Sequence, residues 1–275
     1  MEKRGFSNSM YVAELRYIQS IHESVELKNP DNLVGHFLPP LRRWRCKLLS
    51  RKSLSSLRED PFYYYLLART KYYDQVFIDS IASGAASIIN IGCGVDTRTC
   101  RFEKMLKENR IQVLECDQSG AISFKQAMAR KVTNSAHVSY TSVDLNEDSW
   151  PFLNDWLHHN PGRTTVLMEG VSPYIDIQTF NQFLRFLGSA LAAGSVIAYD
   201  FKVQGVSDTF GRVGRTQQPF RLSANRKKIE EYHSALGLRL ISWEGSSELT
   251  RRFISMADPK VPLFVEDSLV QLLVS

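Results

Sequence analysis

The sequence of 275 residues predicts an α/β fold with a doubly wound, mostly parallel sheet and a helical N-terminal cap. Two observations lead to this prediction. From Ser87 onward, short apolar runs alternate with amphipathic stretches, which is the pattern of consecutive βαβ units. The first eighty or so residues instead place apolar side chains at helical spacing. We expect one domain over residues 1–275, with a helical cap or lid region at 1–84 and the sheet at 85–275.

Three helical regions are expected in the cap. The first carries an apolar stripe with Ser9 as its candidate N-cap, and Pro39-Pro40 interrupts the pattern. The second runs from Leu41 to about Leu57. The third begins at Asp60-Pro61, because proline is favoured at the first helical position. Its aromatic side chains, from Tyr63 to Tyr73, are expected to pack mainly on the core.

Six short apolar runs are the expected strands of the sheet, and they are Ser87–Ile91, Ile111–Glu115, Val138–Val143, Thr165–Met168, Val196–Tyr199 and Leu238–Trp243. The helices expected between them include Gln118–Lys131, Thr179–Ala193 and Asn225–Leu236. Chirality makes the crossovers between parallel strands right-handed. A last apolar segment, Leu263–Val274, is expected to form an edge strand or an antiparallel strand.

The composition is that of an ordinary globular protein, with 43% hydrophobic and 23% charged residues. The net charge of +5 is mild and spread along the chain. The densest basic stretch, Arg42–Lys52, alternates with apolar residues, so we expect a solvated or snorkelling helix face there. We therefore expect no nucleic-acid partner. We also expect no membrane partner, because no apolar run approaches the roughly 20 residues that span a bilayer.

The cysteines and the first residues bear on the cellular compartment. The four cysteines form no CxxC pair and no two histidines have metal-ligand spacing, so we expect free thiols and no metal. The opening residues, MEKRGFSNSM, lack the apolar core of a signal peptide. These features together predict a cytoplasmic location, where thiols stay reduced.

Polar residues gather at the expected carboxyl ends of the strands, which is where open α/β sheets bind ligands. The first strand is followed by the turn Gly92-Cys93-Gly94, and Thr97 occupies the place where a dinucleotide site has its third glycine. The other strand ends supply Glu115, Asp117, Asp144, Glu169, Tyr174 and Asp200. One acid in such a place is most often a loop residue or a helix cap. Asp96, after the glycine turn, has the alternative interpretation of a cap of the helix that follows. Five acids at one edge of a sheet indicate a ligand site.

This edge suits a ligand with hydroxyl and ammonium donors better than a pyrophosphate, which needs backbone donors and cations. S-adenosylmethionine has such donors. Its ribose hydroxyls and its adenine amino group can donate to acids after the second and third strands, and its amino-acid end can approach the glycine turn. Its sulfonium is a cation that aromatic faces and carbonyl oxygens hold. The missing third glycine disfavours a dehydrogenase.

Several segments resemble the leucine carboxyl methyltransferase family and its bacterial O-methyltransferase relatives. They are INIGCGVDTRTCRF, ECDQSGAISFK, VDLN, MEGVSPYI, ARTKYYD, QPFRL and SMYVAELRYIQS, and they extend over nearly the whole chain. The resemblance implies a Rossmann-like methyltransferase sheet of class I with S-adenosylmethionine as cofactor. The chain is compact for the eukaryotic branch that methylates a phosphatase, which favours the bacterial small-molecule branch.

The resemblance also implies a role for each matching residue. Arg69 would pair with the methionine carboxylate, Gly92 and Gly94 would line that end of the cofactor, Asp117 would hold the ribose hydroxyls, Asp144 and Leu145 would frame the adenine, Glu169 would lie near the amino group or the methyl-transfer zone, and Tyr174 would face the acceptor. The family has a basic residue near the start of the cap, for which Arg58 is a candidate. Two alternatives stay open: Arg69 as a surface ion pair with Asp74, and Tyr174 as a core residue at a strand end.

Methyl transfer is an in-line displacement at an activated methyl group, so the protein mainly aligns the two reactants. A carboxylate acceptor needs no base, because its ordinary pKa lies well below neutrality. A hydroxyl acceptor would benefit from one, and Asp200 and Tyr174 are the nearest candidates, with Asp208 a weaker one. No histidine lies clearly at a strand end, and His233 in a predicted helix is expected to be structural.

The function that follows is an S-adenosylmethionine-dependent O-methyltransferase acting on a carboxylate or hydroxyl of a small molecule. A polyketide- or peptide-type natural product of secondary metabolism, free or carrier-bound, is the acceptor class considered. The alternatives are a protein C-terminal carboxyl methyltransferase and a non-catalytic cofactor-binding scaffold protein. The oligomeric state stays open.

Overall fold

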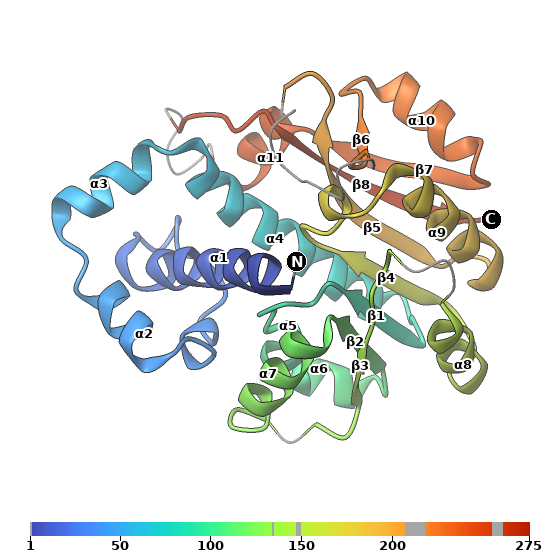
Figure 1. Cartoon of the computed structure of the whole chain (residues 1–275), viewed down its shortest axis with the longest axis horizontal. Helices are drawn as coiled ribbons and strands as arrows, with labels where there is room; N and C mark the ends of the chain where they lie inside the picture. The colour runs from blue at the N-terminus through green and yellow to red at the C-terminus, as the bar shows by residue number, and fades with distance from the viewer. Residues whose placement is uncertain (1, 134, 147–149, 207–217, 255–260) are drawn as a thin grey trace.

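The computed structural model describes residues 2–133, 135–146, 150–206, 218–254 and 261–275, with the side chains of residues 2–7 not described. In this part of the chain an eight-stranded sheet carries helices on both faces, and a group of helices from the N-terminal part lies beside it (Figure 1). The mostly parallel α/β fold is as predicted, and the extended strands adopt the order β3-β2-β1-β4-β5-β8-β7, with β6 pairing to β5. The division between residues 84 and 85 stays a prediction.

The parallel half of the sheet follows the predicted runs closely. Its strands are β1 (Ser87–Ile91), β2 (Gln112–Asp117), β3 (Val138–Ser142), β4 (Thr164–Met168) and β5 (Val196–Val203). Chain order reverses at β1, which pairs with β2 on one side and β4 on the other. Ligand sites of open α/β sheets form at such a reversal, beyond the carboxyl ends of the strands. The glycine turn follows β1 and therefore lies at this point.

The far half of the sheet contains the antiparallel pairs. The strands β6 (Arg221–Leu222), β7 (Leu238–Glu244) and β8 (Asp267–Val274) complete the sheet. The short strand β6 pairs parallel with β5, whereas β8 runs antiparallel to both β5 and β7. The antiparallel alternative for the last segment is therefore confirmed. The edge alternative is wrong: β8 lies inside the sheet, and most of its residues are buried on both faces, as expected for an interior strand.

Helices cover the sheet in the predicted alternation. They are α5 (Arg98–Arg101), α6 (Glu103–Glu108), α7 (Ser119–Ala129), α8 (Pro151–His159), α9 (Ile177–Ala190), α10 (Arg226–Ser234) and α11 (Ser246–Phe253), with the short 3₁₀ turn η2 (Ser172–Tyr174) after β4. Successive strand residues point to opposite faces. Accordingly Ile88 belongs to the hydrophobic cluster on the cap side, while Ile89 belongs to the cluster under α9 and α10.

The cap consists of α1 (Glu2–His22), η1 (Val34–His36), α2 (Pro40–Lys47), α3 (Arg51–Glu59) and α4 (Pro61–Ala82). Ser9 lies inside α1 and is not at its N-cap position, because the helix begins earlier than its apolar stripe. The region predicted as one helix from Leu41 to Leu57 is two helices, since Ser50 accepts a hydrogen bond from the Ser53 amide and starts α3. The helix α4 begins at Pro61 as expected, and Asp60 caps it by accepting from the Phe62 amide.

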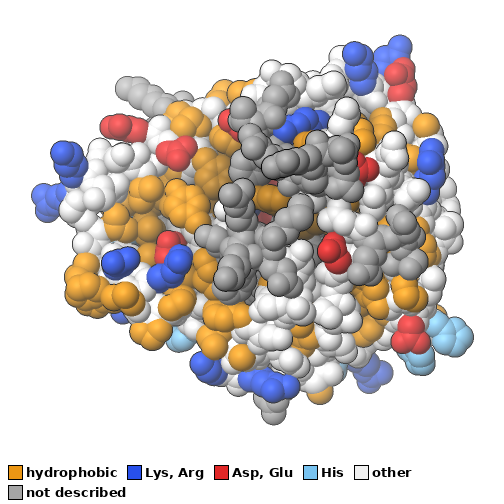
Figure 2. Space-filling model, viewed as in Figure 1, with side chains coloured by type: hydrophobic (Ala, Val, Ile, Leu, Met, Phe, Trp, Pro, Cys, Tyr) orange, Lys and Arg blue, Asp and Glu red, His pale blue; other side chains and the backbone are white. Residues whose placement is uncertain are grey.

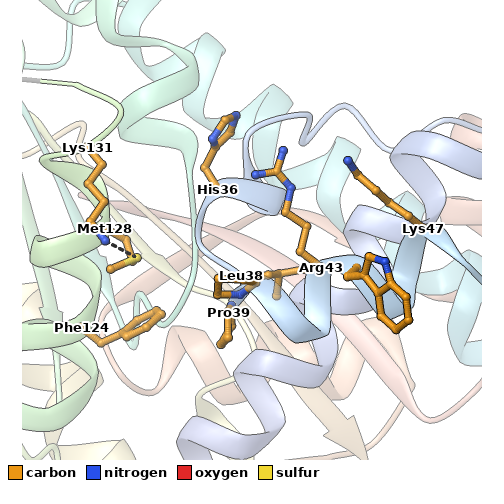
Figure 3. A pocket seen from close by; sticks show the side chains of 10 residues that line it. His36, Leu38, Pro39, Arg43, Lys47, Phe124, Met128 and Lys131 are labelled. Carbon is orange, nitrogen blue, oxygen red and sulfur yellow. Dashed lines mark hydrogen bonds between the residues drawn. The ribbon is translucent and has the colours of Figure 1, made fainter.

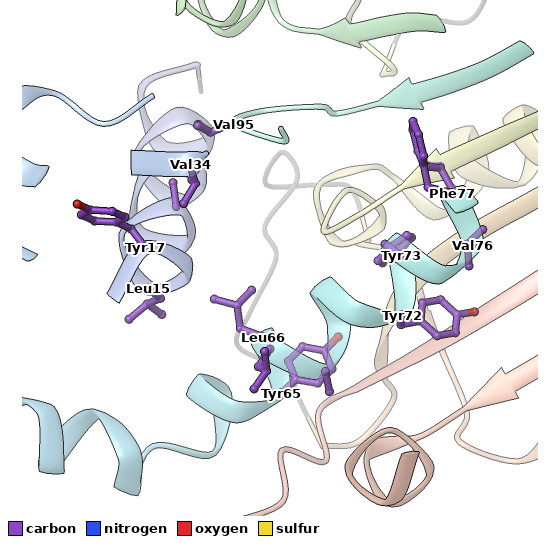
Figure 4. Packing of buried hydrophobic residues seen from close by; sticks show 14 of the residues in the cluster. Leu15, Tyr17, Val34, Tyr65, Leu66, Tyr72, Tyr73, Val76, Phe77 and Val95 are labelled. Atoms are coloured by element: carbon purple, nitrogen blue, oxygen red, sulfur yellow. The ribbon is translucent and has the colours of Figure 1, made fainter. Parts of the chain in front are cut away.

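The long helix α4 joins the cap to the sheet. Most of its side chains are buried, including Tyr72, Tyr73 and Phe77. Figure 4 shows these residues on α4 and, farther along the same cluster, Leu15 and Tyr17 of α1. The prediction that the aromatic residues pack on the core is confirmed. A single apolar cluster therefore runs from α1 through α4 to the sheet.

Candidate cofactor site

The turn after β1 has a backbone that requires glycine. Gly92 and Gly94 have φ values of +65° and +43°, in the left-handed region that side chains disfavour. A Cβ atom on Gly92 would lie 2.3 Å from Cγ2 of Val171, so the loop after β4 packs directly on the turn. A Cβ atom on Gly94 would lie 3.1 Å from Cβ of Ser9, so α1 approaches the turn from the cap side.

Asp117 ends β2 beside this turn. One of its carboxylate oxygens accepts a hydrogen bond of 2.7 Å from the Gly94 amide, and the other accepts one of 2.7 Å from the Gln118 amide. Burial raises the pKa of Asp117, and the two backbone donors counteract that rise. Each carboxylate oxygen retains a second lone pair, so Asp117 can also accept from a hydroxyl of a ligand.

Glu115 does not lie beside the glycine turn, although it was expected with Asp117 at the carboxyl end of the second strand. It lies two residues inside β2, which is about 7 Å along a strand. Its carboxylate is fully buried, with Lys125 Nζ at 2.6 Å and the Thr99 hydroxyl at 3.0 Å. Glu115 therefore belongs to a buried ion pair under the turn and not to the ligand edge.

Asp144 and Leu145 follow β3, the neighbour of β2. The Val143 amide donates to the Asp117 carbonyl at 2.9 Å, which fixes the two strand ends side by side. Asp144 is exposed and accepts a hydrogen bond from the Asn146 amide, while Leu145 is buried in the hydrophobic cluster. A polar and an apolar group thus lie one strand away from Asp117.

Arg69, Glu169 and Asp200 form a cluster between α4, the end of β4 and the interior of β5. Arg69 Nε donates to Glu169 at 3.1 Å and Arg69 Nη1 donates to Asp200 at 3.3 Å. The alternative that Arg69 forms a surface ion pair with Asp74 is wrong, because residues five apart on a helix face different directions. Asp74 instead pairs with Arg98 and Arg101.

The two acids of this cluster differ in their electrostatic balance. For Glu169, burial favours the neutral form, but Arg98 and Arg69 outweigh it and the pKa falls below its ordinary value. For Asp200, burial outweighs Arg69 and raises the pKa to about 6. Asp200 also accepts from the Tyr73 hydroxyl at 3.2 Å and from the Gly170 amide at 2.6 Å. The expectation that β5 ends before Asp200 is wrong, since the strand continues to Val203 under the pairing with β8.

Tyr174 lies in η2, at the cap side of the loop after β4. Its hydroxyl accepts a hydrogen bond of 2.9 Å from the Asn8 side chain of α1. The side chain is only partly buried, which contradicts the alternative of a core residue. Burial nevertheless raises the pKa of Tyr174 above its ordinary value, so the phenol is neutral at physiological pH. Asp208, the weaker base candidate, lies outside the described residues.

Two arginines near the turn had no role in the sequence analysis. Arg98 is 1% exposed, and its guanidinium reaches Asp96 at 2.6 Å, Asp74 at 2.8 Å and Glu169 at 2.9 Å. Asp96 also accepts from the Arg98 amide at 2.7 Å, although the N-cap position of α5 is Thr97, so Asp96 acts on the first turn from one residue outside the cap. Arg98 therefore ties the glycine turn, α4 and the end of β4 together.

Arg16 is the cap cation that the structure places at the turn. Its Nη2 donates to the Val95 carbonyl at 2.8 Å, and its Nη1 lies 3.1 Å from Asp31. Arg58, the residue chosen from the sequence, pairs instead with Glu23 at 3.0 Å, at the far end of the cap. The sequence could have suggested Arg16 because it lies in the segment SMYVAELRYIQS that resembles the family.

The family of this chain follows from its similarity to known proteins. Residues 10–188 match the family model described as leucine carboxyl methyltransferase. The chain belongs to the leucine carboxyl methyltransferase family. A relative from Frankia alni is 28% identical over 148 residues, covering 53% of this chain and 50% of that protein. One from Streptomyces coelicolor is 27% identical over 209 residues, covering 74% and 72%. Both are named as S-adenosyl-L-methionine-dependent methyltransferases.

The chain spans about half the length of the first curated relatives that it matches. Among solved structures, magnesium protoporphyrin IX methyltransferase from Synechocystis with bound SAH aligns with a TM-score of 0.50 and 13% identity, over 81% of this chain and 93% of that one. At 13% identity this similarity supports only the fold of the present chain.

Two further properties concern the described residues only. They contain no group of three His, Cys, Asp or Glu side chains that could hold a metal ion. None of their helices has the length and apolar character that crossing a bilayer requires. The four cysteines, all described, are buried and unpaired as expected.

Proposed function

We propose that this protein is an S-adenosylmethionine-dependent methyltransferase that methylates an oxygen atom of a small molecule. The observation that supports it most directly is Asp117, held by the Gly94 amide at the end of β2. This carboxylate faces the edge where the sheet reverses its chain order, with no third glycine after the turn to receive a pyrophosphate. The family match and the names of the relatives support the same cofactor.

The side chains around the glycine turn can complement both parts of S-adenosylmethionine, the zwitterionic methionine and the nucleoside. Arg69 uses two of its five N–H donors on Glu169 and Asp200, so donors remain for the methionine carboxylate. Glu169, whose lowered pKa keeps it ionised, can accept from the methionine ammonium group. Asp117 would hold the ribose hydroxyls, Asp144 and Leu145 would border the adenine, and Gly92 and Gly94 allow the close approach.

Bound S-adenosylmethionine supplies a methyl group on a positively charged sulfur, and the protein has to place an acceptor oxygen in line with it. Tyr174 is the proposed acceptor-facing residue, because its hydroxyl lies on the cap side of the loop after β4. Its raised pKa makes it a hydrogen-bond donor to the acceptor and not a base at neutral pH.

Asp200 is better explained as a positioning residue than as a general base. Three donors already converge on its carboxylate, from Arg69, Tyr73 and Gly170. A proton taken from an acceptor would weaken its pairing with Arg69. With neither Asp200 nor Tyr174 suited to remove a proton, an acceptor that is already ionised, a carboxylate or an acidic hydroxyl, is the proposed class.

Calorimetric titration with S-adenosylmethionine tests the cofactor site. Wild-type protein is expected to bind in the micromolar range, and Asp117→Ala is expected to weaken binding by about 100-fold or more, because two hydrogen bonds to a charged group are lost. Asp117→Asn removes the charge but keeps an oxygen that can accept from the Gly94 amide, so it separates the effect of the charge from the effect of that contact. Asp155→Ala, on exposed α8, is the matched control and should bind normally.

NADH serves as the competing ligand. Binding of NADH in place of S-adenosylmethionine, or no binding of S-adenosylmethionine to folded wild-type protein, would refute the proposal. Cofactor binding without turnover of any carboxylate or acidic hydroxyl in an acceptor panel would refute the proposed acceptor class and favour the scaffold alternative.

A further inference from the structure

The cap carries a basic surface that the proposed function does not use. Residues 32–58 contain seven Lys or Arg residues and no Asp or Glu. In the part of the chain that the structure describes, no ion pair engages Arg45, Lys47, Arg51 or Lys52, and all four are exposed. A concentrated positive charge without internal partners marks a surface for an anionic partner.

Apolar side chains project from the same surface. Leu41, Trp44 and Leu48 are 61%, 58% and 61% exposed. They recur at i, i+3 and i+7, so they form one row on the outer side of α2, away from the buried Cys46. Figure 2 shows hydrophobic side chains gathered over the cap helices, with Lys and Arg side chains around them. The described structure leaves this row open to solvent, at a cost that a partner would remove.

A groove beside the row combines the same two chemistries. It has a volume of about 460 Å³ and lies between α2 and α7. Leu38, Pro39, Phe124 and Met128 form its apolar part, and His36, Arg43, Lys47 and Lys131 lie around it (Figure 3). An apolar floor with cations at its margin matches a molecule that has an anionic head and an apolar tail.

We propose that α2, with the groove beside α7, docks this protein on the surface of an anionic lipid bilayer. The row of Leu41, Trp44 and Leu48 would enter the interface between head groups and acyl chains, as amphipathic basic helices with Trp and Leu do. The exposed cations of residues 42–52 would lie among the anionic head groups. The groove would receive one lipid at the edge of this contact.

Charge and location favour a bilayer over an acidic protein. The apolar row lies with Arg45 and Lys47 along α2, and Arg51 and Lys52 follow at the start of α3. Both helices lie at the edge of the molecule (Figure 1), where a broad surface can reach them. The expectation of no membrane partner rested on the lack of a spanning segment, and docking at an interface needs none. This proposal does not depend on the proposed function.

Sedimentation with lipid vesicles tests it on the full chain. At low salt, the protein is expected to bind vesicles of phosphatidylcholine with 30% phosphatidylglycerol and not vesicles of phosphatidylcholine alone. Arg45→Gln/Lys47→Gln should weaken binding by about 25-fold, since each cation near such a surface contributes about five-fold. Lys227→Gln/Lys228→Gln on α10 removes the same charge from another exposed surface and should leave binding unchanged.

A second pair of variants separates insertion from charge attraction. Trp44→Ser/Leu48→Ser keeps every cation and should still lose most binding, while its circular dichroism spectrum and its affinity for S-adenosylmethionine stay unchanged. The proposal would be overturned if Arg45→Gln/Lys47→Gln and Lys227→Gln/Lys228→Gln bound vesicles equally well. It would also be overturned if the wild-type protein did not bind anionic vesicles. Binding of soluble dioctanoyl-phosphatidylglycerol, or of an 18-residue acidic Leu/Glu helix, without vesicle binding would assign the surface to a monomeric amphiphile or to a protein and would also overturn it.

Discussion

Replacing Arg98 by methionine should destabilise the protein strongly at neutral pH. Methionine keeps most of the apolar contacts of the side chain but leaves the buried carboxylates around it with fewer cations. Asp74 would still have Arg101, at 2.6 Å, and Glu169 would still have Arg69, at 3.1 Å. Asp96 would keep only neutral donors, the Asn90 side chain and the backbone amide of residue 98.

The expected loss of stability follows from the one carboxylate, Asp96, that is left without a paired cation. Breaking a buried ion pair by removing one partner costs about 3–5 kcal/mol. Two of the three carboxylates retain another arginine, so the expected loss lies at the lower end, about 3 kcal/mol. In a chain of this size that corresponds to a fall in Tm of about 6–12 °C. The assay is urea unfolding followed by circular dichroism, with exposed Arg239→Met as the matched control.

The loss should also depend on pH. In the wild type, burial disfavours the charged form of Asp96 but Arg98 outweighs it, and the pKa falls below its ordinary value. Such a group adds stability above its unfolded pKa and loses it as the pH falls. In Arg98→Met, burial is opposed only by the more weakly acting cations Lys125 and Arg16 and by the backbone amide of residue 98, so the pKa of Asp96 should rise and the deficit should shrink between pH 7 and pH 4. A loss below about 1 kcal/mol, or one that is the same at both pH values, would refute the reasoning.

Three further predictions concern single residues. Gly92→Ala should abolish cofactor binding and cost about 2–4 kcal/mol of stability, because its Cβ would lie 2.3 Å from Val171 at a φ of +65°; normal calorimetric binding would contradict this. His233 is fully buried and its pKa is lowered to about 4 by burial, so the unfolded chain binds its proton first and stability should fall by up to about 3 kcal/mol from pH 7 to pH 4. His233→Gln should lose that part of the pH dependence in urea titrations. Lys125→Met should cost about 3–5 kcal/mol by stranding Glu115, and Glu115→Gln in the same chain should restore part of it; an additive double mutant would exclude the coupling.

Periodicity was sufficient to predict the parallel half of the sheet. The strand Ser87–Ile91 has the predicted bounds, because this mostly apolar run is too short for a helix and ends at the glycine turn. The last strand, Asp267–Val274, was harder to place. Its apolar character is equally compatible with an edge or an interior position, and only the pairing with β5 and β7 decides between them.

The site shows the same limit at the level of side chains. Asp117 and the two glycines could be identified because strand ends and turns are local features of the sequence. The partners of Arg69 could not, since Glu169 and Asp200 lie 100 and 131 residues away along the chain. Arg16 was missed and Arg58 chosen for the same reason: both are cap arginines, and only the path of α1 brings one of them to the turn.

The interior position of β8 determines when this protein can finish folding during its synthesis. In the described part of the chain, β7 pairs with β8 alone, so it has no place in the sheet until the ribosome has released residues up to Val274. Until then the inner edge of β5 stays unpaired where β8 will insert, and Asp200 lies on that edge. Nascent chains should therefore have an open β5 edge from the synthesis of Val203 until β8 follows at Asp267–Val274, and this is the period in which a chaperone would have to protect that edge.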